Sequence, residues 1–186
     1  DRRTSYDGPD TWWPTPEPAH RINQIYLEPI LFAAASAAAN ITIYNECELI
    51  DAKQDENGVS ATVRDLTGGT TTTIRAQYLV GCDGGRSPVR NLIGAKLVGD
   101  AIVQRAQSTY IRAPKLLSLI PGRPGWMNLS LNPRRSGNTI AIDGKETWLI
   151  HNHLYEGEPE FDSIDRDWAI RTILGVGPDF QYEVVS

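Results

Sequence analysis

Tyr78-Leu79-Val80-Gly81-Cys82-Asp83-Gly84-Gly85-Arg86-Ser87-Pro88-Val89-Arg90 is the most informative stretch of the chain. Its apolar first part, residues 78–82, predicts a short buried strand that ends at Asp83. Gly84 and Gly85 then favour a tight turn, because glycine adopts backbone angles that other residues resist. The stretch therefore predicts a strand that leads into a glycine turn.

The residues after this turn have the chemistry to bind an anionic or hydroxyl-rich ligand. Ser87 and Pro88 suit the start of a helix, as the N-cap and the first helical residue. A helix N-terminus offers free backbone N–H groups and the positive end of a dipole to such a ligand. Asp83, close to Arg86 and Arg90, is expected to stay ionised and to accept hydrogen bonds from ribose hydroxyls. A pair between Asp83 and an arginine that only fixes the turn is compatible with the same pattern.

The whole pattern resembles the Asp-Gly fingerprint of class A flavoprotein aromatic hydroxylases, the family of para-hydroxybenzoate hydroxylase and phenol monooxygenase. In that family the motif lies near the pyrophosphate and ribose of FAD and influences the binding of the nicotinamide cofactor. The resemblance implies that this chain uses FAD and NAD(P)H. It also implies cofactor-binding roles for Asp83, Gly84, Arg86, Ser87 and Arg90.

A second segment that resembles this family lies near the start of the chain. Apolar residues at helical spacing over residues 20–39 predict a helix. Pro29 removes one helical hydrogen bond, so the helix either kinks there or begins near Glu28. In the family an Arg-x-x-Gln helix lies beside the flavin ring, which implies that Arg21 and Gln24 contact FAD. A surface helix with ordinary polar positions is the alternative interpretation.

Alternating apolar residues predict strands along most of the remaining chain. In the first half these are residues 41–44, 47–53, 59–65 and 70–76, with hairpin turns at Asn57-Gly58 and Thr67-Gly68-Gly69. In the second half they are residues 102–112, 126–131, 138–143, 147–154 and 180–185. Residues 163–174 predict an amphipathic helix capped by Asp162 or Ser163.

These elements predict an α/β fold in two domains, with α+β character in the second. Residues 1–94 are expected to form part of a Rossmann-like FAD-binding domain with an antiparallel β-meander. Residues 95–186 are expected to form an antiparallel sheet with helices on one face, which the resemblance identifies as a substrate domain. The boundary is placed near Gly94, where a short helix stops.

Composition narrows the classes of partner. The 186 residues carry a net charge of −5 and no basic tract, which argues against nucleic-acid binding. The longest apolar run, residues 30–39, is too short to span a membrane. We expect a cytoplasmic protein in which Cys47 and Cys82 are buried thiols, and exposed sheet edges allow a homodimer.

Polar residues of the second half are candidates for contact with a small aromatic substrate. His151 and His153 have strand spacing and point to one face, as do Tyr110 and Arg112. A metal site is not expected, because no third ligand lies near the two histidines. Since the family's substrate lies on this sheet, the resemblance implies that all four line its cavity. The adjacent Arg134-Arg135 is interpreted as a solvated pair in a turn.

The resemblance extends over all 186 residues but matches only the middle of the expected protein. No Gly-x-Gly-x-x-Gly pyrophosphate turn is present, and Gly175-Val176-Gly177 is followed by Pro178. We expect an internal fragment that binds FAD weakly or not at all and is inactive by itself. The resemblance implies that the parent enzyme hydroxylates an aromatic compound through a flavin C4a-hydroperoxide, and no catalytic residue is assigned. A halogenase or prenyl-chain reductase with the same fingerprint, or a non-catalytic module, are the alternatives.

Overall fold

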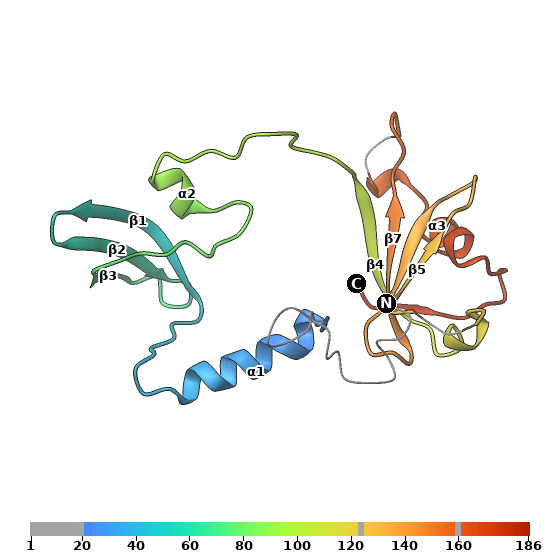
Figure 1. The fold of residues 1–186 in the computed structure, drawn as a ribbon, viewed down its shortest axis with the longest axis horizontal. Helices are drawn as coiled ribbons and strands as arrows, with labels where there is room; N and C mark the ends of the chain where they lie inside the picture. Colours follow the sequence, from blue (N-terminus) through green and yellow to red (C-terminus); the bar gives the residue numbers. More distant parts are fainter. Residues whose placement is uncertain (1–20, 123–124, 159–160) are drawn as a thin grey trace, which may run out of the picture. The chain divides into compact units, whose positions relative to one another are not determined.

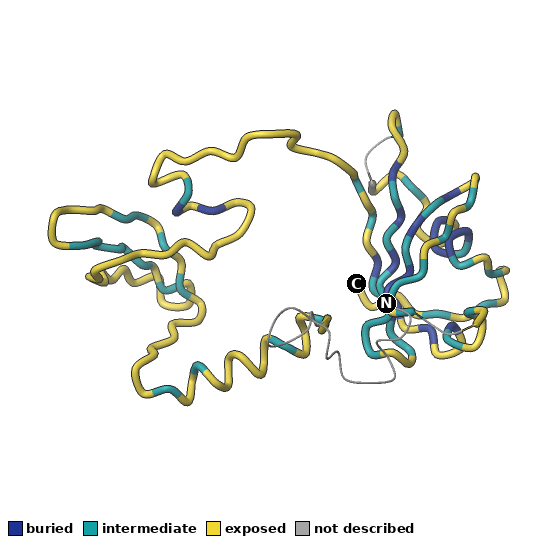
Figure 2. Tube along the Cα trace, viewed as in Figure 1, coloured by how far each residue is buried: buried dark blue, intermediate teal, exposed yellow. Residues whose placement is uncertain are grey.

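The computed structural model describes residues 21–122, 125–158 and 161–186. The chain forms two compact units, Asp1–Leu97 and Val98–Ser186, each with its own sheet (Figure 1). Residues 1–19 are rich in Pro, Gly and Asp, which predicts an extended loop, and they lie outside the described residues. Buried residues, drawn dark blue in Figure 2, are concentrated in the second unit.

The first unit begins with helix α1, Gln24–Ala37. The helix starts at Gln24 and contains Pro29, so the alternative start near Glu28 is wrong. The alanine-rich turns after Pro29 have high helix propensity, which offsets the hydrogen bond that proline cannot donate. No residue of α1 is buried.

An antiparallel meander follows, with β1 (Cys47–Asp55), β2 (Gly58–Asp65) and β3 (Thr71–Ala76) in sequence order. These three strands confirm the prediction to within two residues at each end. Gly58 is required at the first turn, because its φ is +136° and an added Cβ would lie 2.4 Å from the Ala76 carbonyl oxygen. Residues 41–44, by contrast, are irregular, so the strand predicted there is wrong.

The apolar stretch before the glycine turn also differs from its prediction. Residues 78–82 are neither a strand nor buried, with Tyr78 83% and Val80 78% exposed. Cys82 is exposed and Cys47 only half-buried, so the prediction of two buried thiols is also wrong. In the described part of the chain no strand pairs with this segment, and an unpaired segment is not held in β form. Helix α2, Pro88–Leu92, then follows as predicted and ends before Gly94, whose φ is +71°.

The second unit is built on a five-stranded antiparallel sheet with the order β5-β6-β7-β4-β8. Its strands are β4 (Ala106–Arg112), β5 (Met127–Ser130), β6 (Gly137–Ala141), β7 (Thr147–His153) and β8 (Glu183–Val184). Short 3-10 helices occupy Leu117–Leu119 and Phe161–Ser163. The predicted strands all occur, although β4 starts later and β8 is shorter than expected.

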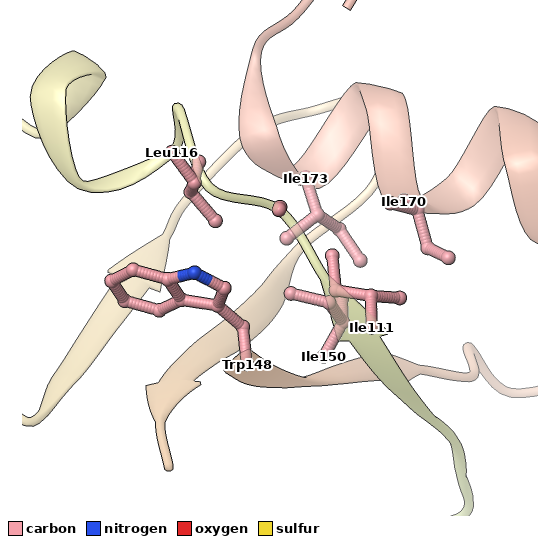
Figure 3. Close-up of a cluster of buried hydrophobic side chains, with 7 residues drawn as sticks. Ile111, Leu116, Trp148, Ile150, Ile170 and Ile173 are labelled. Atoms are coloured by element: carbon pink, nitrogen blue, oxygen red, sulfur yellow. The ribbon is translucent and has the colours of Figure 1, made fainter. Parts of the chain in front are cut away.

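Helix α3, Arg166–Leu174, covers one face of this sheet. Ile170 and Ile173 of the helix pack against Ile111, Trp148 and Ile150 of the strands (Figure 3). The cap is Asp165, whose side chain accepts a hydrogen bond from Trp168 N at 3.1 Å, so the caps predicted at residues 162 and 163 are wrong. Those two residues belong to the preceding 3-10 helix.

Arg135 is buried in the second unit, which overturns its interpretation as half of a solvated pair. Only 3% of the residue is exposed. Its guanidinium donates to both carboxylate oxygens of Glu158, at 2.8 and 2.5 Å, and to the His153 carbonyl at 3.1 Å. It also lies over the rings of Tyr155 and Trp168, at 4.9 and 5.2 Å from their centroids. A buried charge is tolerated because it is paired and hydrogen-bonded in this way.

Candidate functional site

The glycine turn after residue 83 is open to its surroundings. Gly84 has a φ of +73°, the left-handed region that favours glycine. An added Cβ on Gly84 or Gly85 would meet nothing within 4 Å, and both residues are exposed. The turn therefore has room for a bound molecule, as the sequence interpretation requires.

Asp83 fastens the start of α2 to this turn. Its carboxylate accepts hydrogen bonds from the Ser87 hydroxyl and from Val89 N, the latter at 3.1 Å. The Ser87 oxygen in turn accepts from Arg90 N at 2.9 Å, which confirms Ser87 as the N-cap. These bonds correct one expectation: the N–H groups of residues 89 and 90 are already used by side chains. Helix α2 therefore does not offer them to a ligand.

Hydrogen bonds also set the charge of Asp83. The Ser87 hydroxyl, and then the Val89 N–H, lower the pKa of its carboxyl below the ordinary value. The predicted ionised state is thus supported, mainly by hydrogen bonding, with a smaller contribution from Arg90. An ionised carboxylate with lone pairs to spare accepts further hydrogen bonds from hydroxyl groups.

The two arginines of the motif differ in their surroundings. Arg90 donates to the carbonyl oxygens of Gly85 at 2.8 Å and Gly84 at 3.4 Å, so its guanidinium fixes the turn. Arg86 is exposed. Arg86 and Arg90 are one helical turn apart in the sequence, but of the two only Arg90 donates side-chain hydrogen bonds to the turn in the described part of the chain. Of the pair, Arg86 is the better candidate for contact with an anionic ligand.

Gly81 is a residue of this site whose role sequence reasoning missed. An added Cβ there would lie 2.7 Å from Val89 Cβ and 3.2 Å from Asp83 Oδ1. The glycine lets the buried Val89 pack against the segment that leads into the turn. A glycine inside an apolar run was the available signal, since it marks a close backbone approach.

Gln24 lies in the first turn of α1 and Arg21 lies just before the helix. The Gln24 side-chain amide donates to the Glu28 carboxylate one helical turn further on, so this bond stays within the helix. Contact of Gln24 or Arg21 with a cofactor remains a prediction.

We expect acid to break the hydrogen bonds that the Asp83 carboxylate accepts from Ser87 and Val89, which we call the Asp83 clamp. Because folding lowers the pKa of Asp83, its stabilisation of α2 is complete above the ordinary value of 3.8 and is lost as the pH falls below it. The amide signals of Val89 and Arg90, followed by NMR, should therefore change together with a midpoint below 3.8. Ser87→Ala should raise that midpoint, and Asp83→Asn should abolish the transition. An unshifted midpoint would show that the clamp is absent in solution.

The candidate substrate residues lie on one face of the second unit's sheet. Register pairs Ser108 with His151 and Tyr110 with Leu149, and residues two apart on a strand share a face. His153 and Arg112 therefore point to the same side, away from α3. Arg112 donates to both carboxylate oxygens of Glu146, at 3.0 and 3.2 Å. No group of three metal-ligating side chains occurs in the described residues.

His151 has a partner that sequence reasoning missed. Its Nδ1 lies 2.7 Å from the Ser108 hydroxyl oxygen. Burial, and then the nearness of His153, lowers the pKa of His151, so the imidazole is neutral near pH 7. No local sequence signal points to Ser108, because the contact depends on how β4 and β7 pair.

Comparison with known proteins shows which proteins the chain is similar to. The profile of a family described as "FAD binding domain" matches residues 2–172. A putative polyketide hydroxylase of Streptomyces halstedii is 33% identical, over 86% of this chain and 29% of its own length. Aklavinone 12-hydroxylase DnrF of Streptomyces peucetius subsp. caesius is 34% identical, over 77% of this chain and 29% of its own length.

Among solved structures, the flavin-dependent monooxygenase PieE in complex with FAD and substrate matches with a TM-score of 0.78. It is 24% identical, over 89% of this chain and 29% of that protein. This likeness confirms the predicted α/β fold with its antiparallel sheets. The chain thus spans 29% of the length of these relatives. In the described residues no helix is both long and apolar enough to cross a membrane.

Proposed function

The chain belongs to the FAD-binding-domain family of flavin-dependent aromatic hydroxylases, and we propose on that premise that it is an internal part of an FAD- and NAD(P)H-dependent aromatic monooxygenase. The proposal depends mainly on the profile match, which runs through the Asp83 turn and into α3. In this role the first unit contributes to the flavin site and the second unit holds an aromatic substrate.

The residues of the Asp83 turn fit a nucleotide cofactor. Asp83 is ionised and can accept ribose hydroxyls, while the open backbone at Gly84 and Gly85 lets a ligand approach closely. Arg86 supplies an exposed positive charge for a phosphate. When bound, FAD supplies the oxygen chemistry and NAD(P)H the electrons.

The open face of the five-stranded sheet is the proposed substrate surface. Tyr110 and Leu149 offer half-buried apolar area to an aromatic ring, and His151 offers a neutral polar group beside it. These side chains would orient the ring and exclude water from one side of it.

We predict that the 186-residue chain binds FAD more weakly than micromolar. It contains no Gly-x-Gly-x-x-Gly turn for the pyrophosphate, and the N–H groups of Val89 and Arg90 are already bonded. Titration followed by flavin fluorescence measures the affinity. A micromolar or tighter dissociation constant would show that this chain forms a complete flavin site.

The activity itself is tested in the protein that carries this chain, purified with FAD. Phenolic compounds should stimulate NAD(P)H oxidation, and oxygen from ¹⁸O₂ should appear in the product. Asp83→Ala should weaken FAD binding about tenfold, the effect of one hydrogen bond to a charged group. A chlorinated product in the presence of halide would favour a halogenase, and failure to retain any flavin would favour a non-catalytic module.

A further inference from the structure

One row of polar side chains crosses the sheet face that α3 leaves uncovered. Ser108 of β4 and Asn138 of β6 lie directly opposite His151 of β7, one on each side. Residues directly opposite in antiparallel strands point to the same face. The three polar side chains therefore stand next to one another across three strands.

An apolar row runs beside this polar row. Tyr110, Leu149 and Ile140 are paired in register on the same three strands. Each lies two residues from its counterpart in the polar row, which places the rows next to each other on one face. Ile140 is buried, whereas Tyr110 and Leu149 are half-buried, so an aromatic ring that lies on these two residues has its edge at His151.

Ser108 fixes the ring of His151 by its contact with Nδ1. In the described part of the chain the His151 ring makes no other hydrogen bond, so Nε2 is left for a ligand. Since the imidazole is neutral near pH 7, one of its nitrogens carries a lone pair that can accept a hydrogen bond.

We propose that His151 Nδ1–H donates to Ser108, so that Nε2 accepts a hydrogen bond from a hydroxyl group on the aromatic substrate. His151 then selects hydroxylated rings, and Ser108 is a positioning residue that acts through it. The proposal rests on the proposed function, because it takes this face as the substrate surface. A carboxylate fits less well, because a neutral Nε2 lone pair cannot donate to it. Arg112, the one arginine or lysine among the described strand residues of this face, is also paired with Glu146.

Two arenes test this assignment on the full chain. They share the same ring system, but one carries a hydroxyl group where the other carries a methoxy group, which cannot donate a hydrogen bond. Histidine labelled with ¹⁵N in the ring gives signals from three residues, and labelled leucine methyl groups report contact with Leu149. Both 2-naphthol and 2-methoxynaphthalene should shift the Leu149 methyl signals, but only 2-naphthol should shift His151 Nε2. The affinity for 2-naphthol should be about five- to tenfold higher, as one hydrogen bond of ordinary strength provides.

Variants separate the hydrogen bond from general effects on the fold. His151→Gln and Ser108→Ala should each lower the preference for 2-naphthol. Ser108→Thr, which keeps the hydroxyl, should retain it. Arg134→Gln is the control, because it alters an exposed residue of the second unit outside this face and should leave the preference intact.

Three results would overturn the proposal. They are a proton on Nε2 in the free chain, an equal Nε2 response to both arenes, and a full preference for 2-naphthol in His151→Gln. In each case the Leu149 methyl shifts would still support the substrate surface. If neither arene shifts Leu149, the substrate surface in the proposed function is wrong, and the role of His151 fails with it.

Discussion

Replacing Arg135 by alanine should destabilise the second unit by about 3 kcal/mol, because the change leaves the Glu158 carboxylate without its buried partner. The substitution also removes the cation that lies over the Tyr155 and Trp168 rings. Hydrogen exchange of β7 amides in the full chain measures this loss, since it reports opening of the second unit alone.

Arg134→Ala is the matched control, because it removes the same side chain from the neighbouring position, which is exposed. The free energy of opening obtained from its exchange rates should stay within about 0.5 kcal/mol of that of the unaltered chain. Arg135→Lys should recover part of the stability, since lysine keeps the charge but cannot donate two parallel hydrogen bonds to Glu158. Equal effects for the substitutions at 134 and 135 would contradict the buried ion pair.

The strands of the meander are predictable because their signals are local. Side chains alternate along β1, β2 and β3, and Asn57-Gly58 is a strong signal for a tight hairpin. Each signal lies within a few residues of the element that it specifies. The N-cap Ser87, which directly precedes Pro88, is predictable for the same reason.

Residues 78–82 are misassigned because an apolar composition does not make a strand by itself. A strand needs adjacent strands that pair with its backbone N–H and C=O groups, and the sequence of residues 78–82 does not indicate whether such strands are present. Its apolar side chains are instead exposed in this chain. An apolar composition is thus compatible with a buried strand, but it does not show that residues 78–82 form one.

The contacts of the second unit depend on pairings over long distances in the sequence. Ser108 and His151 are 43 positions apart, and their contact follows from the register of β4 with β7. Arg135 forms its buried ion pair with Glu158, which lies 23 positions further along the chain. A slip of one residue in register would turn His151 to the other face. Sequence therefore predicts which residues are polar on this face, but not which of them meet.

Trp148→Ala should destabilise the second unit by about 3–5 kcal/mol, the usual cost of truncating a fully buried aromatic side chain. Trp148 is 0% exposed and belongs to the core cluster of the second unit, where its ring lies near Leu116 (Figure 3). Hydrogen exchange of β4 and β7 amides measures the loss. Leu149→Ala is the control, since it is the next residue on β7, points to the open face and should cost far less.

The indole N–H makes a second substitution informative. In the described residues Trp148 Nε1 is buried without a hydrogen-bond partner, a condition that costs about 1–3 kcal/mol. Trp148→Phe removes this unpaired donor and keeps most of the aromatic packing, so it should cost about 1 kcal/mol, well below the alanine substitution. If Phe is as destabilising as Ala, the indole N–H has a partner in solution, and the packing of Trp148 in the core cluster alone does not account for its contribution.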